Sequence, residues 1–273
     1  MPITQAEKAA SFRALHAAPG TFVIANAWDP GSARILAGLG FAALATSSGA
    51  AAGVMGRRDG RITRQEKLDH ARAIVAATDL PVSADLEKGF GDTPEIAAET
   101  IRLAAGVGLV GGSIEDASGD PARPIFDFPL AVERMAAAVE AARGTGTGFV
   151  LTGRTENYLR GNPDLDDTIR RLVAFQNAGA DVLMAPGLPD LDSVRAVCSA
   201  LNKPFNFMAG MRGRSFTVAA LADAGVKRVS LATSLFRSAM SAVVTAATEV
   251  RDHGTFGYID TDMSSADLGR FLE

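Results

Sequence analysis

Cysteine is almost absent from this chain of 273 residues, and charge of either sign is not concentrated in any segment. Cys198 is the single cysteine, so an internal disulfide and a thiolate-rich metal site are both excluded. The net charge is −4, and there is no run of lysine and arginine. A nucleic-acid partner would need a basic stripe, so the composition argues against one.

Long apolar segments are also missing. Charged residues or glycines interrupt every apolar run well before the roughly 20 residues that a membrane-spanning helix needs. The first residues, Met1–Lys8, are polar and lack the charged-then-apolar order of a signal peptide. We therefore expect a soluble cytoplasmic protein without a membrane partner.

Hydrophobic residues make up 47% of the chain, and they recur as short runs that alternate with helical patterns. Eight alternations without a break in composition predict one α/β domain over residues 1–273, a (β/α)₈ TIM barrel, with a doubly wound open sheet as the alternative. Residues 234–273 hold two further helical segments, 234–250 and 264–272, as a C-terminal extension. The eight predicted strands are 22–25, 42–46, 82–85, 110–115, 148–153, 181–185, 205–207 and 228–231.

Three carboxylates stand at the ends of two neighbouring predicted strands. Asp85 and Glu87 lie within the run 81–91, where the predicted strand stops, and Glu115 ends the next strand. We expect Asp85 and Glu87, two positions apart on one strand, to point to the same side. Oxygen ligands at strand ends suit a hard divalent cation, and barrels keep their chemistry at this edge. The pattern predicts a metal-dependent enzyme with Mg²⁺ as the cofactor and Mn²⁺ as a substitute.

Other polar residues are predicted at the same edge. Thr46, Ser47 and Ser48 follow the second strand, where their backbone N–H groups could hold a carboxylate. Arg154 ends the fifth strand and could bind a substrate carboxylate, or else pair with Glu156 or Asp181 as a structural salt bridge. Cation ligands beside an arginine suit a small oxo-acid. Three more candidates complete the set: Asp59, Asn206 and Arg237.

In order and spacing these motifs resemble those of the isocitrate lyase/phosphoenolpyruvate mutase superfamily, over nearly the whole chain. The motifs that carry the resemblance are 26–29 (NAWD), 46–49 (TSSG), 85–91 (DLEKGFG), 114–116 (IED), 153–155 (GRT) and 225–230 (GVKRVS).

The resemblance implies a Mg²⁺-dependent barrel that makes or breaks a C–C or P–C bond beside a pyruvate-like enolate. It also implies a homotetramer, a dimer of dimers that exchange their eighth barrel helix. By position, Asp85 is the direct Mg²⁺ ligand, and Glu87 and Glu115 bind through water. Asp59 is the catalytic aspartate, and Arg154 holds the substrate carboxylate. Thr46, Ser47 and Ser48 surround the pyruvyl end, and Asn206 and Arg237 contact the distal part of the substrate.

The chain departs from the superfamily pattern in the lid after the fourth strand. Residues 118–127 replace the Lys-Lys-Cys-Gly-His lid of isocitrate and methylisocitrate lyases, whose cysteine acts as an acid. Glu87 also replaces the commoner aspartate. The pattern resembles the cysteine-free branch and predicts a lyase that cleaves a C–C bond of a small α-keto or α-hydroxy (di)carboxylate, for example an oxaloacetate decarboxylase. The alternatives are a phosphonopyruvate hydrolase or mutase and a weakly active keto-acid-binding protein.

Overall fold

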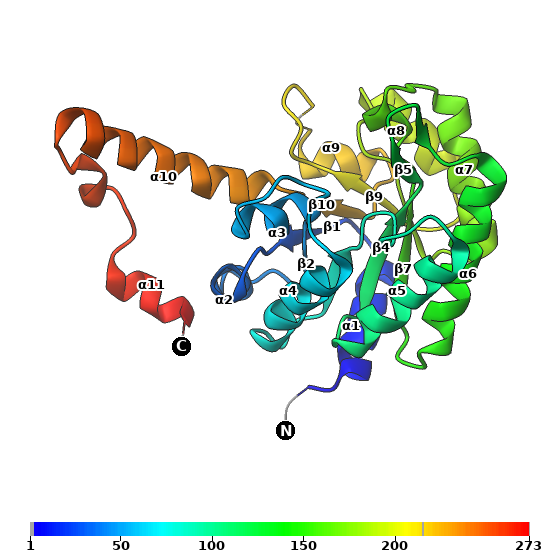
Figure 1. Ribbon diagram of the computed structural model, residues 1–273, viewed down its shortest axis with the longest axis horizontal. Coiled ribbons are helices and arrows are strands. Elements are labelled where there is room, and N and C mark those ends of the chain that lie inside the picture. Colours follow the sequence, from blue (N-terminus) through cyan, green and yellow to red (C-terminus); the bar gives the residue numbers. More distant parts are fainter. Residues whose placement is uncertain (1–2, 215, 273) are drawn as a thin grey trace.

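The computed structural model describes residues 3–214 and 216–272. Eight parallel strands close into a barrel, and helices surround it (Figure 1). Neighbouring strands follow the circular order β1-β10-β9-β8-β7-β4-β3-β2, so the predicted barrel is confirmed and the open sheet is wrong. The strands are β1 (Phe22–Asn26), β2 (Leu44–Ala45), β3 (Val82–Asp85), β4 (Gly111–Glu115), β7 (Val150–Arg154), β8 (Val182–Met184), β9 (Phe205–Met208) and β10 (Arg228–Ser230).

The helices of the outer layer begin at side chains that cap their free N–H groups. Asp29, Thr63 and Asp164, for example, each accept a hydrogen bond from the first turn of α2, α4 and α7. The outer helices are α2 (Pro30–Gly38), α4 (Arg64–Ala76), α5 (Pro94–Gly106), α6 (Phe128–Gly144), α7 (Leu165–Ala178), α8 (Leu191–Ala200) and α9 (Val218–Asp223).

Helix α1 (Gln5–Ala17), which the sequence did not predict, belongs to the N-terminal end of the barrel. Its Phe12 is fully buried in a cluster with Ile24, Val150 and Val182 from the strands. A Cβ added at Gly111 of β4 would meet the Phe12 ring at 2.9 Å. The helix therefore closes one end of the barrel and leaves the carboxyl ends of the strands for the site.

Three short elements interrupt the regular alternation on the site side. Helix α3 (Ser48–Val54) follows β2, and the hairpin of β5 (Ala117–Asp120) and β6 (Arg123–Ile125) follows β4. A single 3₁₀ turn, η1 (Asn157–Arg160), follows β7. Of these elements, α3 and η1 place Ser48 and Arg160 beside carboxylates of the site.

The C-terminal extension leaves the barrel as one long helix. Helix α10 (Ser234–His253) has no buried residue, and η2 (Gly257–Asp260) leads to α11 (Ser265–Leu272). Helix α10 projects away from the barrel, and α11 returns toward α2 (Figure 1). Within residues 3–214 and 216–272, no helix combines the length and apolarity needed to cross a membrane.

Candidate active site

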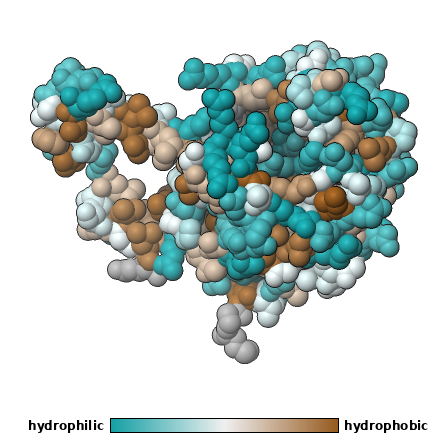
Figure 2. All heavy atoms as spheres, in the orientation of Figure 1, coloured by the Kyte–Doolittle hydropathy of each residue, from teal (hydrophilic) through white to brown (hydrophobic). Residues whose placement is uncertain are grey.

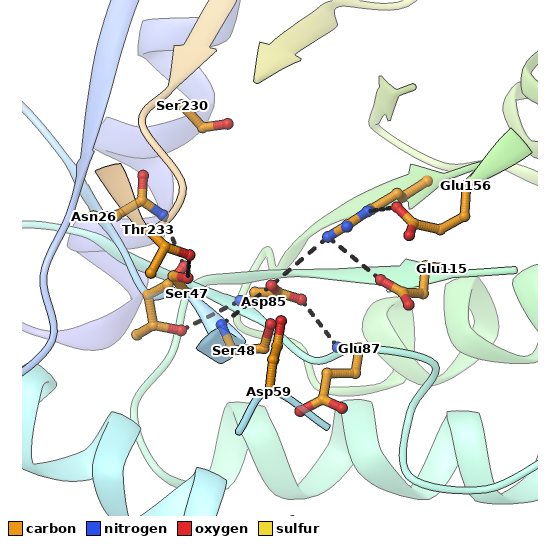
Figure 3. Close-up of polar contacts among 12 residues, drawn as sticks. Asn26, Ser47, Ser48, Asp59, Asp85, Glu87, Glu115, Glu156, Ser230 and Thr233 are labelled. Atoms are coloured by element: carbon orange, nitrogen blue, oxygen red, sulfur yellow. Dashed lines mark hydrogen bonds and ion pairs between the residues drawn. The ribbon is translucent and has the colours of Figure 1, made fainter. Parts of the chain in front are cut away.

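A cavity of about 420 Å³ opens at the carboxyl ends of the strands and continues into the barrel. Glu87 and Glu115 are outside its wall, but the Glu87 N–H donates to Asp85, and Glu115 pairs with Arg154 (Figure 3). The fold thus gathers residues that are far apart in sequence. The predicted residues that line the cavity are Thr46, Ser47, Ser48, Asp59, Asp85, Arg154, Asn206 and Arg237.

Asp85 ends β3 with its carboxylate in the cavity wall. Its Oδ2 accepts a hydrogen bond from the Ser48 N–H at 3.2 Å, and its Oδ1 accepts one from the Glu87 N–H at 3.1 Å. Burial by itself would raise the pKa of Asp85, but Arg154 and Lys67 outweigh it and hold that pKa below its usual value. Asp85 is therefore an ionised carboxylate that faces the cavity.

The prediction that Glu87 lies on the same strand as Asp85 is wrong. The strand ends at Asp85, and Glu87 has a φ of 51°, in the left-handed region that few non-glycine residues adopt. Its Oε1 is buried without a hydrogen-bond partner in the described part of the chain. Burial, and next the charge of Asp85, raise the pKa of Glu87 to about 7.

Arg154 lies at the centre of an acidic group. Its Nε donates to Glu156 Oε1 at 2.6 Å, whereas its Nη1 is 3.6 Å from Asp85 and 3.3 Å from Glu115. Asp181, the other predicted partner, pairs instead with Arg13. Only the Nε contact is a close hydrogen bond, and Nη2 has no hydrogen-bond partner among the described residues. Arg154 is thus anchored by Glu156 with a donor left for a ligand.

Glu115 is a second buried carboxylate beside Arg154. It pairs with Arg154 and, at 3.5 Å, with Arg160 from η1. Burial raises its pKa to about 8, although Arg154 acts in the opposite direction. Both glutamates therefore hold protons at pH values where an exposed glutamate is ionised.

The turn after β2 is the N-terminus of α3 rather than a loop. Ser47 caps this helix, accepts from the Ala50 N–H, and pairs with the Thr233 hydroxyl at 2.9 Å. The backbone N–H groups of this turn were expected to bind a ligand carboxylate. One of them, the Ser48 N–H, instead donates to Asp85 within the protein. Thr46 Oγ1 likewise accepts from the Asp85 N–H at 3.3 Å.

Asn206 and Arg237 both line the cavity, but Asn206 is buried in the barrel and Arg237 is exposed. Asn206 is fully buried inside the barrel, and its amide donates to the Ser230 hydroxyl at 3.0 Å. Arg237 lies in the first turn of α10 at the cavity wall, where its Nη2 donates to the Gly210 carbonyl. Asn206 is thus fixed within the barrel, whereas Arg237 lies beside the start of the projecting helix.

Lys67 is a residue of the site that the sequence analysis missed. It lies on α4, is fully buried, and its Nζ has no hydrogen-bond partner within residues 3–214 and 216–272. Burial lowers its pKa, and the charges of Asp85, Glu87 and Asp59 oppose that shift. A sequence signal did exist, because Lys67 shares a helix face with the buried residues Ala71 and Ile74.

The acidic group fits a divalent cation in a restricted way. No three histidine, cysteine, aspartate or glutamate side chains of the described chain are close enough to hold an ion directly. Yet Glu87 has a buried oxygen without a partner among the described residues, and ionisation of Glu87 and Glu115, whose pKa values are raised, would leave more negative charge than Lys67 and Arg154 neutralise. This surplus suits a cation held directly by one carboxylate and through water by the others.

Comparisons with known proteins identify the family. The model of the phosphoenolpyruvate phosphomutase family matches residues 12–251. The chain belongs to the PEP mutase/isocitrate lyase superfamily. A crystal structure of a candidate lyase/mutase from Burkholderia cenocepacia J2315 is 52% identical, with a TM-score of 0.96 over 98% of this chain and 97% of that one.

Curated superfamily members are more distant. An uncharacterized protein of Mycobacterium tuberculosis H37Rv is 32% identical over 89% of both chains. An oxaloacetate decarboxylase of Chromohalobacter salexigens is 29% identical over 88% of this chain and 84% of its own. Homologues also include methylisocitrate and dimethylmalate lyases. The superfamily thus contains C–C lyases and PEP mutases.

Most of the predicted lid, residues 118–127, lies in the β5–β6 hairpin. Its Arg123 is largely exposed and lies 3.8 Å from Asp120 in the same hairpin. Cys198, by contrast, lies on α8, and burial raises the pKa of its thiol to about 12. The hairpin therefore supplies no thiol acid from its own sequence.

Proposed function

We propose that the protein is a Mg²⁺-dependent lyase that cleaves a C–C bond of a small α-keto or α-hydroxy dicarboxylate through a pyruvate-type enolate. One observation carries the proposal: a single cavity wall contains the ionised Asp85 and a guanidinium, Arg154, with a free donor. A cation site beside an anion site matches the two ends of an α-keto acid. Oxaloacetate decarboxylation and retro-aldol cleavage both belong to this class.

Asp85 would hold the cation directly, and Glu87 and Glu115 would hold it through water. When bound, Mg²⁺ (or Mn²⁺) supplies Lewis-acid stabilisation for negative charge on a substrate oxygen. Arg154 would bind the substrate carboxylate through its free Nη2, while Glu156 fixes the guanidinium plane. The Thr46–Ser48 turn would close the pyruvyl end, and Arg237 and Asn206 would lie toward the distal part of the substrate.

Asp59 is the candidate for proton transfer. It lines the cavity next to α3, where its Oδ2 would be 3.3 Å from a Cβ added at Gly49. Its Oδ1 accepts from the Gly60 N–H at 3.0 Å, which leaves Oδ2 toward the cavity. From there Asp59 would orient water or move a proton to or from the substrate.

The experiment that tests the proposal is a substrate panel in Mg²⁺ or EDTA. Pyruvate release is measured from oxaloacetate, 2-methylmalate-type hydroxy acids, 4-hydroxy-2-oxo acids and phosphonopyruvate. Metal-dependent release from a C–C substrate supports the lyase. Release from phosphonopyruvate alone would assign the P–C branch, and keto-acid binding without turnover would replace the lyase by a binding protein.

We also propose that α10 is exchanged with a second copy of the chain, within a homotetramer. Its apolar side chains Met240, Val243 and Val244 are exposed, and the apolar surface of the projecting helix is visible in Figure 2. In a (β/α)₈ barrel the helix after the last strand normally packs on the barrel. Because only the first turn of α10 does so here, through Leu235 and Phe236, a partner barrel is the proposed site for the apolar face of the rest of the helix.

A further inference from the structure

Arg228 is a buried cation inside the barrel with no carboxylate beside it. It begins β10, is 5% exposed, and forms no ion pair with any described residue. Its Nε donates to Asn206 Oδ1 at 2.7 Å, and its Nη2 donates to Thr152 Oγ1 at 3.0 Å. Its Nη1 lies 3.2 Å from His16 Nε2. All three partners are side chains without a negative charge.

The neutrality of His16 follows from its hydrogen bonds. Its Nδ1 lies 2.8 Å from the Phe12 carbonyl and must donate there, so Nε2 is the acceptor for Arg228. Burial, with the charge of Arg228 next, lowers the pKa of His16 to about 3. Burial likewise lowers the pKa of Arg228 to about 9. A buried guanidinium without a counter-charge is costly unless an anion joins it.

The cavity extends down to this arginine. Its wall includes Arg228 together with the hydroxyl-bearing residues Ser83, Ser113 and Thr152 of three adjacent strands. The hydroxyls of Ser83 and Ser113 take part in no hydrogen bond in the described chain. The Arg228 guanidinium has five N–H donors, of which its three named contacts use three. Arg228 and the two serines therefore line one cavity and keep donors that no described residue uses.

We infer that the floor of the cavity, formed by Arg228 with the hydroxyls of Ser83, Ser113 and Thr152, binds a small anion such as a carboxylate. Nothing else in the described barrel interior balances the charge, and charge-assisted hydrogen bonds to a guanidinium are strong. The occupant is either the second carboxylate of the substrate or a free inorganic anion.

The spacing favours the substrate carboxylate. Thr152, which accepts a hydrogen bond from Arg228, precedes Arg154 by two residues on β7 and faces the same side. The Cα atoms of Thr152 and Arg154 are therefore about 7 Å apart. Arg154 and Arg228 also line the same cavity, along which a four-carbon dicarboxylate can lie with one carboxylate toward each guanidinium. This assignment rests on the proposed function, whereas binding of a free anion does not.

Calorimetry of the Mg²⁺-loaded protein with lactate and malate tests the site, because malate is lactate with one added carboxylate. We expect wild type to bind malate at least about tenfold more tightly than lactate. Arg228→Met should reduce that ratio to about one with little change in lactate affinity, and Arg228→Lys should restore part of it. Ser113→Ala, which leaves the three hydrogen bonds of Arg228 in place, should reduce the ratio about threefold.

A parallel thermal-unfolding measurement separates the two sources of the anion. Chloride added at constant ionic strength should stabilise wild type but not Arg228→Met if the occupant is a free anion, and the malate-to-lactate ratio is then near one. If the ratio is near one and chloride has no Arg228-dependent effect, the inference is wrong. If Arg228→Met does not fold, Ser113→Ala and Arg228→Lys test in the same way whether the floor of the cavity binds an anion. Neither readout needs turnover, so a failed lyase assay leaves this result intact.

Discussion

Arg154 Nε lies 2.6 Å from Glu156 Oε1, and this contact fixes the guanidinium at the cavity wall. Glu156 is fully buried, so its charge acts on Arg154 with little screening by solvent. The ion pair therefore positions Arg154 for substrate binding without occupying all of its donors, because Nη2 stays free for a ligand.

Arg154→Lys should raise KM for the keto acid about 10- to 100-fold, because lysine cannot present two donors in one plane. Glu156→Gln keeps the volume but loses the charge, and we expect a smaller loss of about tenfold in kcat/KM. Steady-state kinetics at saturating Mg²⁺ measures both. Arg13→Lys, at a half-exposed salt bridge with Asp181, is the control that should leave KM unchanged. An unchanged KM in Arg154→Lys would remove Arg154 from the binding site.

Removal of Lys67 should make the protein more dependent on a divalent cation. In Lys67→Met the acidic group loses a buried positive charge, while the side chain keeps a similar length. We expect a lower Tm than wild type in EDTA and a larger increase in Tm on addition of Mg²⁺. Thermal unfolding in both conditions measures this. An equal metal-induced shift in the two proteins would show that Lys67 does not act on the cation site.

The raised pKa values of Glu87 and Glu115 predict how stability depends on pH without metal. Each carboxyl loses its proton near pH 4.5 in the unfolded chain, but only near pH 7 and 8 in the folded one. Between these values the two glutamates bind more protons in the folded state, so they make the free energy of unfolding fall as pH rises. His16, whose pKa is lowered to about 3 in the folded state, acts in the opposite direction below about pH 6.5, so the fall is steepest above that value. Asp116, whose pKa burial raises to about 6, adds to the fall at its acidic end.

Denaturant unfolding in EDTA between pH 6.5 and pH 8 measures that fall. Glu87→Gln should reduce the decrease in the free energy of unfolding near pH 7. Mg²⁺ should reduce the decrease in wild type, because a cation favours the ionised carboxylates. Stability that rises with pH over this range in EDTA would contradict the described environment of the two glutamates.

Gly49→Ala should lower activity without lowering thermal stability. The added Cβ would lie 3.2 Å from Thr233 Oγ1 and 3.3 Å from Asp59 Oδ2, so Asp59 must move by a few tenths of an ångström. Alanine favours a helix over glycine by about 1 kcal/mol, so Tm should not fall, while kcat should fall about tenfold. Gly269→Ala on α11, where the new Cβ meets nothing within 4 Å, is the control. Unchanged kcat in Gly49→Ala would argue against a catalytic position for Asp59.

Exchange of α10 predicts a homotetramer that depends on the apolar face of this helix. Light scattering after size exclusion should give four copies for wild type, and the double substitution Val243→Asp with Val244→Asp should give smaller species. Both side chains are more than half exposed in the single chain, so the substitutions should not unfold the barrel itself. A monomeric wild type would contradict the exchange.

The strands could be predicted from sequence because each is a short apolar run that ends at polar residues. Val82–Asp85 and Arg228–Ser230 match or nearly match the predicted bounds for this reason. Helix α3 could not, because its sequence from Ser48 to Val54 is rich in glycine and alanine and has no amphipathic pattern. It is held by the Ser47 cap and by packing, both of which depend on the fold.

The candidate site was predictable where polar residues follow strands, as for Asp85 and Arg154. Lys67 and Arg228 were missed because a lysine on a helix and an arginine at the start of a strand usually face solvent. Their burial follows from closure of the barrel, which sequence alone does not show. The left-handed backbone at Glu87 was missed for the same reason, since Asp85 and Ser113 determine how the chain leaves β3.

Metal-dependent lyase activity is tested most directly by pyruvate release from oxaloacetate and related C–C substrates during a Mg²⁺ titration of wild type and Asp85→Ala. We predict metal-dependent release by wild type and loss of both the release and the metal dependence in Asp85→Ala, with the fold retained by circular dichroism. Full activity of Asp85→Ala, or equal activity of wild type in EDTA, would contradict the account.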